Sequence, residues 1–563
     1  MDRPGTDGVA RHKHPTVSRI KHGWRWLVAL ALLPLSQTMA SHPANAATPQ
    51  MGGTIIWGEN NGPFDSFIPI VSQAEIVDDE AQAYLFQPLL WINQKVSIDY
   101  SQSIAKSVKA SNNNTTFTVT MRDNYKWSDG TPVTADDVQF CFNLMKQYGT
   151  KYAYYGIGGL PNQVKSFTVN SPTSFTIVMN QTFNPLYFEL NGLAQLRPLP
   201  SKAWAGKDAT YLLNHETDLA TLSVVDGPYK LTKFVTGQYA QFARNSTFGG
   251  HQSYLDTFIV KFYSGAGSTQ AEFADLKSGA IQIGVLDNSL WKSRAQLSGL
   301  KSYNFSLFGF DYIELNYRNP KTSFFKDQAV RQALQLGINQ SEMNQTVYYG
   351  NAHDAYSPVP FAPATYLSDG AKAASPLQFN LAKAGKMLDA DGWKMVGNVR
   401  QKNGQKLAFT ITLISGNATA LQQAEIMQQD YATLGVTINL TQQVFGTVIA
   451  TLGKKGTDWD AVSIGWIYYP NFYPLGDGLF GTTGGANFGG FSDAKLDATI
   501  TESQTKPGLK GIYDYGDYAA KAVPALYLDY PATLIRYSPK VQGINQFFSP
   551  IYAFSPQYLW LSK

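Results

Sequence analysis

Residues 121–145 constrain the fold of this chain more than any other stretch. Around its start, at residues 117–122, apolar and polar residues alternate, which predicts a half-buried β-strand. Asp129-Gly130 predicts a tight turn, and Thr134 predicts a helix N-cap, followed by acidic residues where the helix dipole favours them. The apolar residues of the helix recur at helical spacing, at Val138, Cys141, Phe142 and Met145. The stretch therefore predicts a strand, a turn and a capped helix with structural roles.

The middle of this stretch, residues 127–138, reads W-S-D-G-T-P-V-T-A-D-D-V. It resembles the signature of the family 5 solute-binding proteins, which are the receptors of oligopeptide, dipeptide and nickel ABC importers. Further matching segments lie along the chain, at residues 52–58, 84–90, 227–231, 276–283, 330–334 and 523–528. The resemblance therefore extends from Gly52 to about Tyr530.

The resemblance implies an α/β, two-lobed periplasmic-binding-protein fold of the large cluster, with an extra subdomain and with the lobes joined by two hinge segments. Length agrees with this, because the 517 residues after a leader of 46 are too many for a single hydrophobic core. The predicted parts are a signal peptide at 1–46, lobe 1 at 47–307 with its subdomain at about 72–190, lobe 2 at 308–524 and a return to lobe 1 at 525–563. The hinges are expected near residues 305–310 and 523–530.

The first 46 residues have the pattern of a signal peptide. Basic residues precede an apolar run at 26–35, and Ala44 and Ala46 form an A-x-A cleavage site. The apolar run is too short to span a bilayer, and no cysteine lies near the junction to carry a lipid. We therefore expect an exported, periplasmic protein that is not lipid-anchored; an uncleaved anchor is the alternative.

Charge and motifs argue against several functional classes. The chain has 45 basic and 41 acidic residues, of which the leader holds six and two, so the remainder carries 39 of each. A near-neutral protein gives no reason to expect nucleic acid as a partner. The histidines after the leader show no metal-binding spacing; they are His215, His251 and His353. No P-loop, dinucleotide fingerprint or G-x-S-x-G elbow occurs in the sequence. We expect no metal, cofactor or catalytic residue.

One enzyme class remains as an alternative, a periplasmic hydrolase. Three aspartates near the turn could be read as a carboxylate cluster; they are Asp129, Asp136 and Asp137. Their places in a turn and in the first turn of a helix explain these residues better. A binding protein is therefore the preferred interpretation.

Two aromatic segments supply the candidate ligand-binding residues. One follows the capped helix, and the other ends a predicted apolar strand of lobe 2. Tyr and Trp combine a large apolar face with a hydrogen-bonding tip, which suits a wet binding cleft, although packing between elements would need the same residue types. The candidates are Tyr152, Tyr154, Tyr155, Trp466, Tyr468, Tyr469 and Asn471, with Tyr527 from the returning strand.

The second segment departs from the family at one position. In the family's peptide receptors, a G-W-x-x-D loop supplies an aspartate that binds the ligand's terminal ammonium, whereas Gly465-Trp466 is followed here by Tyr469 in that place. Asn471 is neutral, and the next acid is Asp477. The resemblance implies a monomer that captures a peptide-like solute and delivers it to the permease subunits of an ABC importer. The departure keeps an alternative open, an uncharged oligosaccharide stacked on aromatic faces.

Overall fold

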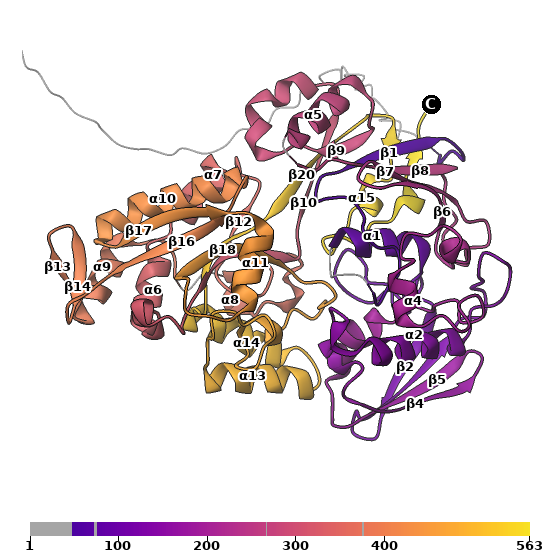
Figure 1. The fold of residues 1–563 in the computed structure, drawn as a ribbon, viewed down its shortest axis with the longest axis horizontal. Coiled ribbons are helices and arrows are strands. Elements are labelled where there is room, and N and C mark those ends of the chain that lie inside the picture. Colours follow the sequence, from indigo (N-terminus) through magenta and orange to yellow (C-terminus); the bar gives the residue numbers. More distant parts are fainter. Residues whose placement is uncertain (1–47, 72–75, 266, 374–376) are drawn as a thin grey trace, which may run out of the picture. The chain divides into compact units, whose positions relative to one another are not determined.

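The computed structural model describes residues 48–71, 76–265, 267–373 and 377–563. The predicted signal peptide lies outside the described residues, as do residues 72–75 at the start of the predicted subdomain. Two large β-sheets and a four-stranded sheet organise the described part of the chain (Figure 1).

The first sheet has seven strands and takes them from both ends of the chain. Its order is β10 (Lys301–Ser306), β20 (Ala532–Tyr537), β9 (Ile283–Val285), β1 (Thr54–Glu59), β8 (Thr257–Phe262), β7 (Tyr239–Arg244) and β6 (Tyr229–Val235). β1 pairs in parallel with β8 and β9, and β20 is antiparallel to β9 and β10. Alternate residues of β8 are buried, as expected for a strand with one face on the core. Elements near this sheet are α1 (Ile76–Leu85), α5 (Ser268–Ser278), α15 (Ile544–Phe547), β21 (Val541–Gln542) and β22 (Trp560–Leu561), whereas α4 (Ala209–Leu213) packs against the helix at 135–148.

The second sheet has six strands. Its order is β12 (His353–Asp354), β19 (Leu526–Tyr530), β11 (Gly309–Leu315), β18 (Ala461–Ile467), β16 (Ala408–Ile414) and β17 (Thr437–Gln443). β16 runs parallel to both β17 and β18, whereas β11 is antiparallel to β18 and β19. Helices of this lobe are α6 (Gln328–Leu336), α7 (Gln340–Thr346), α8 (Asp369–Ala373), α9 (Leu381–Ala390), α10 (Ala418–Leu434), α11 (Phe445–Gly453), α12 (Asp477–Phe480), α13 (Ala494–Thr505) and α14 (Lys510–Ala522).

α10 shows how the sequence pattern becomes packing in this lobe. Met427 and Tyr431 lie on one face at helical spacing, and both are fully buried. Gly435 ends the helix with φ +74°, and its N–H bonds back to the carbonyl of Ala432. Apolar residues at helical spacing and a glycine stop thus define this element.

The chain crosses between the two large sheets at two adjacent points. Leu307 and Phe308 connect β10 to β11, and Pro531 connects β19 to β20. The two crossings touch, because the Leu307 N–H donates to the Pro531 carbonyl at 2.9 Å. The strand at 526–530, expected to belong to the return into lobe 1, instead pairs with β11, with Tyr312 opposite Tyr527. The second crossing therefore follows β19 instead of preceding it.

The four-stranded sheet lies beside α2 (Ala135–Tyr148) (Figure 1). Its order is β2 (Ala105–Ser111), β3 (Thr116–Met121), β5 (Ser174–Met179) and β4 (Val164–Ser171), all antiparallel. The predicted turn is present: Gly130 has φ +89°, and Trp127 N–H donates to the Thr131 carbonyl at 2.8 Å. The buried face of α2 includes Val138, Cys141, Phe142 and Met145. The predicted strand, turn and capped helix are thus confirmed.

Asp137 holds the turn, the helix and a distant loop together. Its Oδ2 accepts from the Thr134 N–H at 2.8 Å and from the Trp127 indole N–H at 3.2 Å. Its Oδ1 accepts from the Ser201 hydroxyl at 2.6 Å and from the Ser201 N–H at 3.2 Å. The carboxylate is 4% exposed, so each of these donors would lose its partner away from water if the carboxylate were removed.

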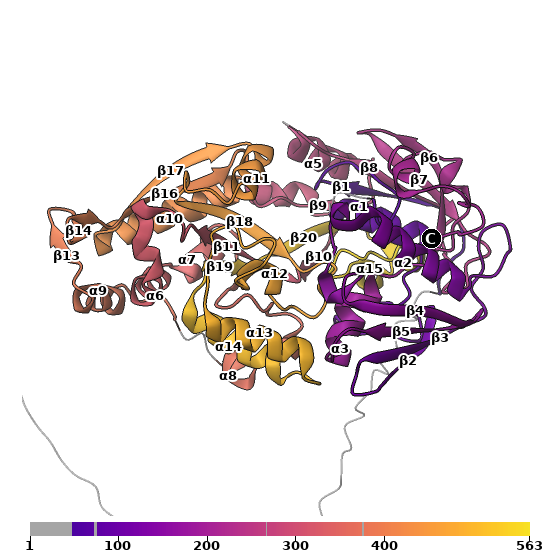
Figure 2. The ribbon, with the colours of Figure 1, turned by 60° about the horizontal axis from the view of Figure 1, so that its bottom comes forward.

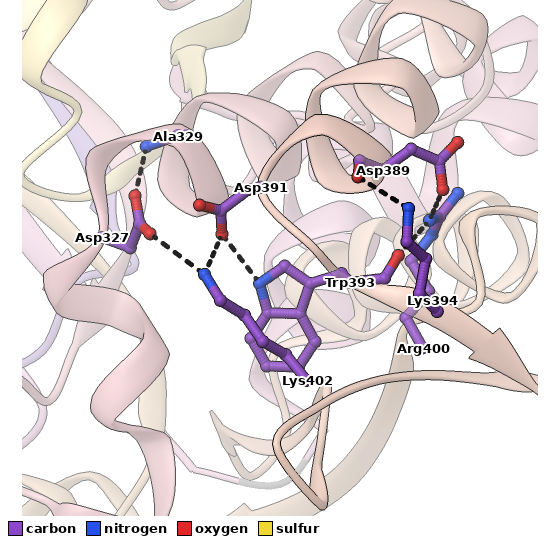
Figure 3. Close-up of polar contacts among 8 residues, drawn as sticks. All are labelled: Asp327, Ala329, Asp389, Asp391, Trp393, Lys394, Arg400 and Lys402. Atoms are coloured by element: carbon purple, nitrogen blue, oxygen red, sulfur yellow. Dashed lines mark hydrogen bonds and ion pairs between the residues drawn. The ribbon is translucent and has the colours of Figure 1, made fainter.

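A hairpin of the second lobe is anchored by charged side chains (Figure 3). The small sheet is β13 (Lys394–Val396), β14 (Val399–Lys402) and β15 (Gln405–Lys406). Arg400 from β14 donates to Asp389 at the end of α9 at 2.5 Å and to the Trp393 carbonyl at 2.8 Å. Lys402 pairs with Asp391 at 2.8 Å. Because Arg400 is buried and also binds the Leu434 carbonyl, this hairpin is fixed to both α9 and α10.

We expect Asp137→Ala to lower the free energy of unfolding by about 2–4 kcal/mol, because several buried donors lose their acceptor. Asp136→Ala is the matched control: its side chain is exposed in the same helical turn, and a change within about 0.5 kcal/mol is expected. Thermal and urea unfolding of the protein check both values. Equal stability of the two variants would contradict the role assigned to Asp137.

Candidate ligand-binding site

The loop after β18 meets residues from the part of the chain that precedes β10. β16, β17 and β18 run in parallel, so their carboxyl ends lie at one edge of the second sheet. Ligands of open α/β sheets bind outside this edge. Trp466 is near the end of β18, and Tyr469 follows in the loop. The predicted aromatic segment therefore lies where the topology places a binding site.

Tyr469 lies at the centre of an aromatic contact between the two parts. Its ring centroid is 6.1 Å from that of Tyr154, at an interplanar angle of 62°, and 5.4 Å from that of Phe472. Edge-to-face rings at such distances attract each other beyond their burial alone. Two of the predicted residues, Tyr154 and Tyr469, are thus brought together from positions far apart in the sequence.

Arg197 joins this contact. Its Nη2 donates to the Tyr469 hydroxyl oxygen at 3.1 Å, and its Nη1 donates to the Phe86 carbonyl at 2.6 Å. The side chain is buried, at 6% exposure. A positive charge therefore lies beside the position where the family's peptide receptors have an aspartate.

Asp79 of α1 supplies the carboxyl group of this contact. Its Oδ2 accepts from the Tyr154 hydroxyl at 2.5 Å. Burial raises the pKa of Asp79 to about 7, and the Tyr154 hydrogen bond and the charge of Arg197 offset only part of that rise. Near neutral pH this carboxyl group is therefore divided between its neutral and charged forms.

Sequence reasoning missed both Asp79 and Arg197. Asp79 stands in an acidic run, Asp78-Asp79-Glu80, which resembles a solvated helix start, yet all three side chains are buried in α1. Acidic residues amid the apolar residues of this helix were the available signal. Nothing in the local sequence around Arg197 connects it to a loop more than 270 positions later.

The remaining predicted residues have other surroundings. Tyr152 donates to the Gln195 side chain at 3.1 Å and contacts the Tyr154 ring, and Tyr155 is half-buried against the main core. Tyr468 and Tyr527 are fully buried in the second lobe, and both contact the Phe310 ring. Their hydroxyls donate to the Pro358 and Ala519 carbonyls at 2.9 and 3.3 Å. These two tyrosines therefore belong to the core of the second lobe that supports the loop.

Trp466 and Asn471 are the last two candidates. Trp466 lies near the end of β18 and is half-buried, and within the described residues its buried indole N–H has no hydrogen-bond partner. Asn471 follows in the loop and is 7% exposed. A buried N–H without a partner is unusual in a folded protein.

Asp477, the next acid after Tyr469, is already engaged. Its Oδ2 accepts from the Gln504 amide at 2.9 Å and from the Tyr187 hydroxyl at 3.3 Å. Nearby, Asn191 forms two hydrogen bonds with the backbone of Tyr473, at 2.7 and 2.9 Å. Asp477 therefore takes part in a contact between the two parts of the chain.

The same contact continues at α3 (Pro185–Tyr187). Asn184, its N-cap, donates through its amide to the Ser503 and Gly508 carbonyls at 2.9 Å each. Figure 2 shows α3 beside α13 and α14 accordingly. The subdomain and the second lobe thus meet through side-chain amides that bind backbone carbonyls.

Over the described residues, no group of three or more His, Cys, Asp or Glu side chains could hold a metal ion. In the same part of the chain, none of the helices is long and apolar enough to cross a membrane.

Most of this chain matches a family of known proteins. The family described as "Bacterial extracellular solute-binding proteins, family 5 Middle" matches residues 99–487. The chain is 24% identical over 445 residues to the oligopeptide-binding protein AppA of Bacillus subtilis (strain 168), covering 77% of this chain and 78% of that protein. It is 26% identical over 419 residues to the nickel-binding periplasmic protein of Escherichia coli (strain K12), covering 73% and 74%.

Solved structures show the same fold. AppA from Bacillus subtilis in complex with a nonapeptide superposes with a TM-score of 0.73 at 21% identity, covering 92% of this chain and all of that one. NikA from Brucella suis in complex with Fe(III)-EDTA gives a TM-score of 0.76 at 20% identity, covering 91% and 100%. The predicted two-lobed α/β fold and the family resemblance are confirmed.

We expect Asp79→Asn to change how stability depends on pH. Between about pH 4 and 7 the folded protein keeps a proton on Asp79 that the unfolded chain has lost, so the free energy of unfolding falls as pH rises. Asparagine cannot ionise, so the variant should gain about 2–3 kcal/mol relative to the wild type between pH 5 and pH 8. Urea unfolding at both pH values measures this. Asp136→Asn, exposed on α2, should show no such gain; an equal gain there would contradict the assignment.

Proposed function

The chain belongs to the bacterial extracellular solute-binding proteins of family 5, and we propose that it captures a peptide-like solute between its lobes and delivers it to the permease subunits of an ABC importer. The observation that carries this proposal is the contact at Tyr469. Side chains from both parts of the chain meet there, at the carboxyl edge of the second sheet. Relatives named as oligopeptide-binding proteins support the ligand class.

A receptor must bind its solute without converting it chemically. The residues at the Tyr469 contact are aromatic, amide and guanidinium groups, together with Asp79, and the hydrogen bonds among them are made within the protein. The aspartates of the rival hydrolase have structural uses: Asp137 is buried under the helix start, and Asp129 accepts from the Thr131 N–H at 2.9 Å within the turn. A receptor is therefore the better-supported class.

The proposal includes export and a mechanical cycle. The leader at residues 1–46 would direct the chain to the periplasm, where it would act as a monomer without a lipid anchor. The two crossings at residues 307–308 and 531 are short and lie between paired strands. Changes of backbone angle concentrated there would open and close the lobes around the solute.

We expect the bound solute to make the protein more compact and to remain chemically unchanged. Small-angle scattering with and without the captured solute should give a smaller radius of gyration in the bound form, because closure brings the lobes together. Native mass spectrometry of the purified protein identifies a co-captured solute for this comparison. An unchanged radius with ligand tightly bound would contradict hinge closure, and product formation would place the protein among the hydrolases.

A free α-amine should contribute little to binding. A buried cation needs a partner charge. Tyr469 and the Arg197 guanidinium offer none, and the Asp79 carboxyl group already accepts from the Tyr154 hydroxyl. Calorimetry with a peptide and its N-acetylated twin should therefore give affinities within about threefold, where an amine-binding carboxylate would give about a hundredfold difference.

If the peptide with the free amine binds more tightly, two variants show which acidic residue binds the amine. A preference lost in Asp477→Asn would show that the acid of the loop takes the amine. A preference lost in Asp79→Asn would assign the amine to α1. Either result would contradict the prediction. If both peptides bind the wild type equally and both bind Trp466→Ala more weakly, binding through the apolar and polar faces of the ligand is supported. An uncharged oligosaccharide could bind in the same way.

A further inference from the structure

Three aspartates form a row across neighbouring strands of the second sheet. Asp311 of β11 is directly opposite Asp529 of β19, and Asp529 is directly opposite Asp354 of β12. Directly opposite residues of antiparallel strands point to the same face of a sheet, with Cβ atoms about 5 Å apart. Like charges in such positions repel each other. The row therefore destabilises the sheet unless its carboxyl groups lose part of their charge.

Gly465 of β18 extends the row and makes room for it. It is directly opposite Asp311, and a Cβ at this glycine would lie 2.4 Å from the Asp311 Oδ1. A side chain there would displace the carboxyl group. The glycine that precedes Trp466 therefore makes space for the aspartate row on one face of β18, whereas Trp466 itself points to the other face.

The partners of the row are neutral. Asp311 Oδ2 accepts from the Tyr348 hydroxyl at 3.4 Å, and Asp529 Oδ2 accepts from the Gln423 amide at 2.5 Å. Within the described residues, none of the three aspartates forms an ion pair. Asp529 is 3% exposed, and its Oδ1 has no partner in the same part of the chain. A proton on Asp529 would allow it to donate to the facing Asp311 carboxylate.

Burial favours a proton at this pair. It raises the pKa of both Asp311 and Asp529, and the charge of Asp311 raises the pKa of Asp529 further. Burial also raises the pKa of Asp354, and the neighbouring His353 offsets part of that rise. The folded protein thus keeps protons that the unfolded chain releases. Their contribution to stability is present at acidic pH and is lost as pH rises through the folded pKa values.

The pair of Asp311 and Asp529 lies beside the crossings between the two large sheets. It is the β11–β19 pair nearest to them, and the register of these strands shifts directly after it. Pro531 follows Asp529 by two positions, and its carbonyl accepts from the Leu307 N–H at 2.9 Å. Repulsion within the pair would therefore act on the strand ends that enter the crossings.

Tyr348 connects the pair to the first lobe. The next residue, Tyr349, stacks on Trp291 of the first lobe, with ring centroids 5.1 Å apart and an interplanar angle of 9°. Tyr349 has φ +53°, a conformation that bulky residues seldom adopt, so its surroundings hold it in place. The Asn304 amide of β10 donates to the Asn351 side chain at 3.4 Å. A movement of Tyr348 would therefore reach contacts between the lobes.

We propose that Asp311 and Asp529 form a proton-controlled joint beside the crossings. With a proton on the pair, β11 and β19 stay together, and Tyr348 holds the stack of Tyr349 on Trp291. When both carboxyl groups have released their protons to water, their repulsion separates the strand ends and loosens the packing between the lobes. The joint operates without a solute, so it does not depend on the proposed transport function.

Hydrogen exchange measured by mass spectrometry tests the joint, on the ligand-free protein between pH 5 and pH 9 and with correction for intrinsic exchange rates. Residues 309–315, 347–351 and 526–530 of the wild type should lose protection at least about tenfold as pH rises. The radius of gyration from small-angle scattering should increase over the same range.

Asp529→Asn keeps one neutral member in the pair at every pH. Its protection should change within about twofold over the same range, and its radius should stay constant. Asp311→Asn should behave in the same way from the other strand. Asp136→Asn, exposed on α2, is the control and should respond as the wild type does. Unfolding midpoints close to the wild type at pH 5 establish that each variant is folded.

Three results would overturn the proposal. One is that protection and radius of the wild type stay constant between pH 5 and pH 9. Another is that both Asn variants of the pair respond as strongly as the wild type, because other groups would then cause the response. The third is that protection in the strands falls while the radius stays constant, because the pair would then have no effect on the packing between the lobes.

Discussion

Strands are paired antiparallel on both sides of the two crossings between the large sheets. The positions of the candidate binding residues depend on this pairing. β10 and β20 pair in the first sheet, β11 and β19 pair in the second, and short links join them at residues 307–308 and 531. Backbone hydrogen bonds leave little freedom within the paired strands. The orientation of one lobe against the other is therefore governed by a few residues, and the loop after β18 is carried with the second sheet.

The electrostatics around Tyr469 follow from what is buried there. Arg197 is buried with its guanidinium bound to a carbonyl and a phenol oxygen, and Asp79 nearby has a pKa of about 7. The guanidinium is charged, and the carboxyl group beside it is partly neutral. This region therefore has either no net charge or a net positive charge. Neutral or anionic ligand atoms suit it better than an ammonium group, because like charges repel strongly where water is excluded.

The polar groups at the Tyr469 contact are used within the protein. The hydroxyls of Tyr154 and Tyr469 and the guanidinium of Arg197 are paired there, so the contact between the lobes is made without a ligand. Such an arrangement suits closure of the lobes around a solute.

The sequence by itself determined the elements whose signals are local. The capped helix α2 and the strand leading to Trp466 were both predicted from periodicity, caps and turns. The motif at residues 127–138 also identified the family, and with it the two-lobed fold. Such features depend on neighbours within a few residues, so a linear pattern contains them.

Only the tertiary structure decided which sheet β19 joins and which side chains surround Tyr469. A buried apolar strand has the same sequence pattern in either sheet, and its hydrogen-bond partner in β11 is more than 200 positions away. Arg197 and Asp79 are likewise brought to this loop from distant segments. Burial and charge at a site depend on these long-range neighbours, and it is burial that changes a surface-like acid into a group with a raised pKa.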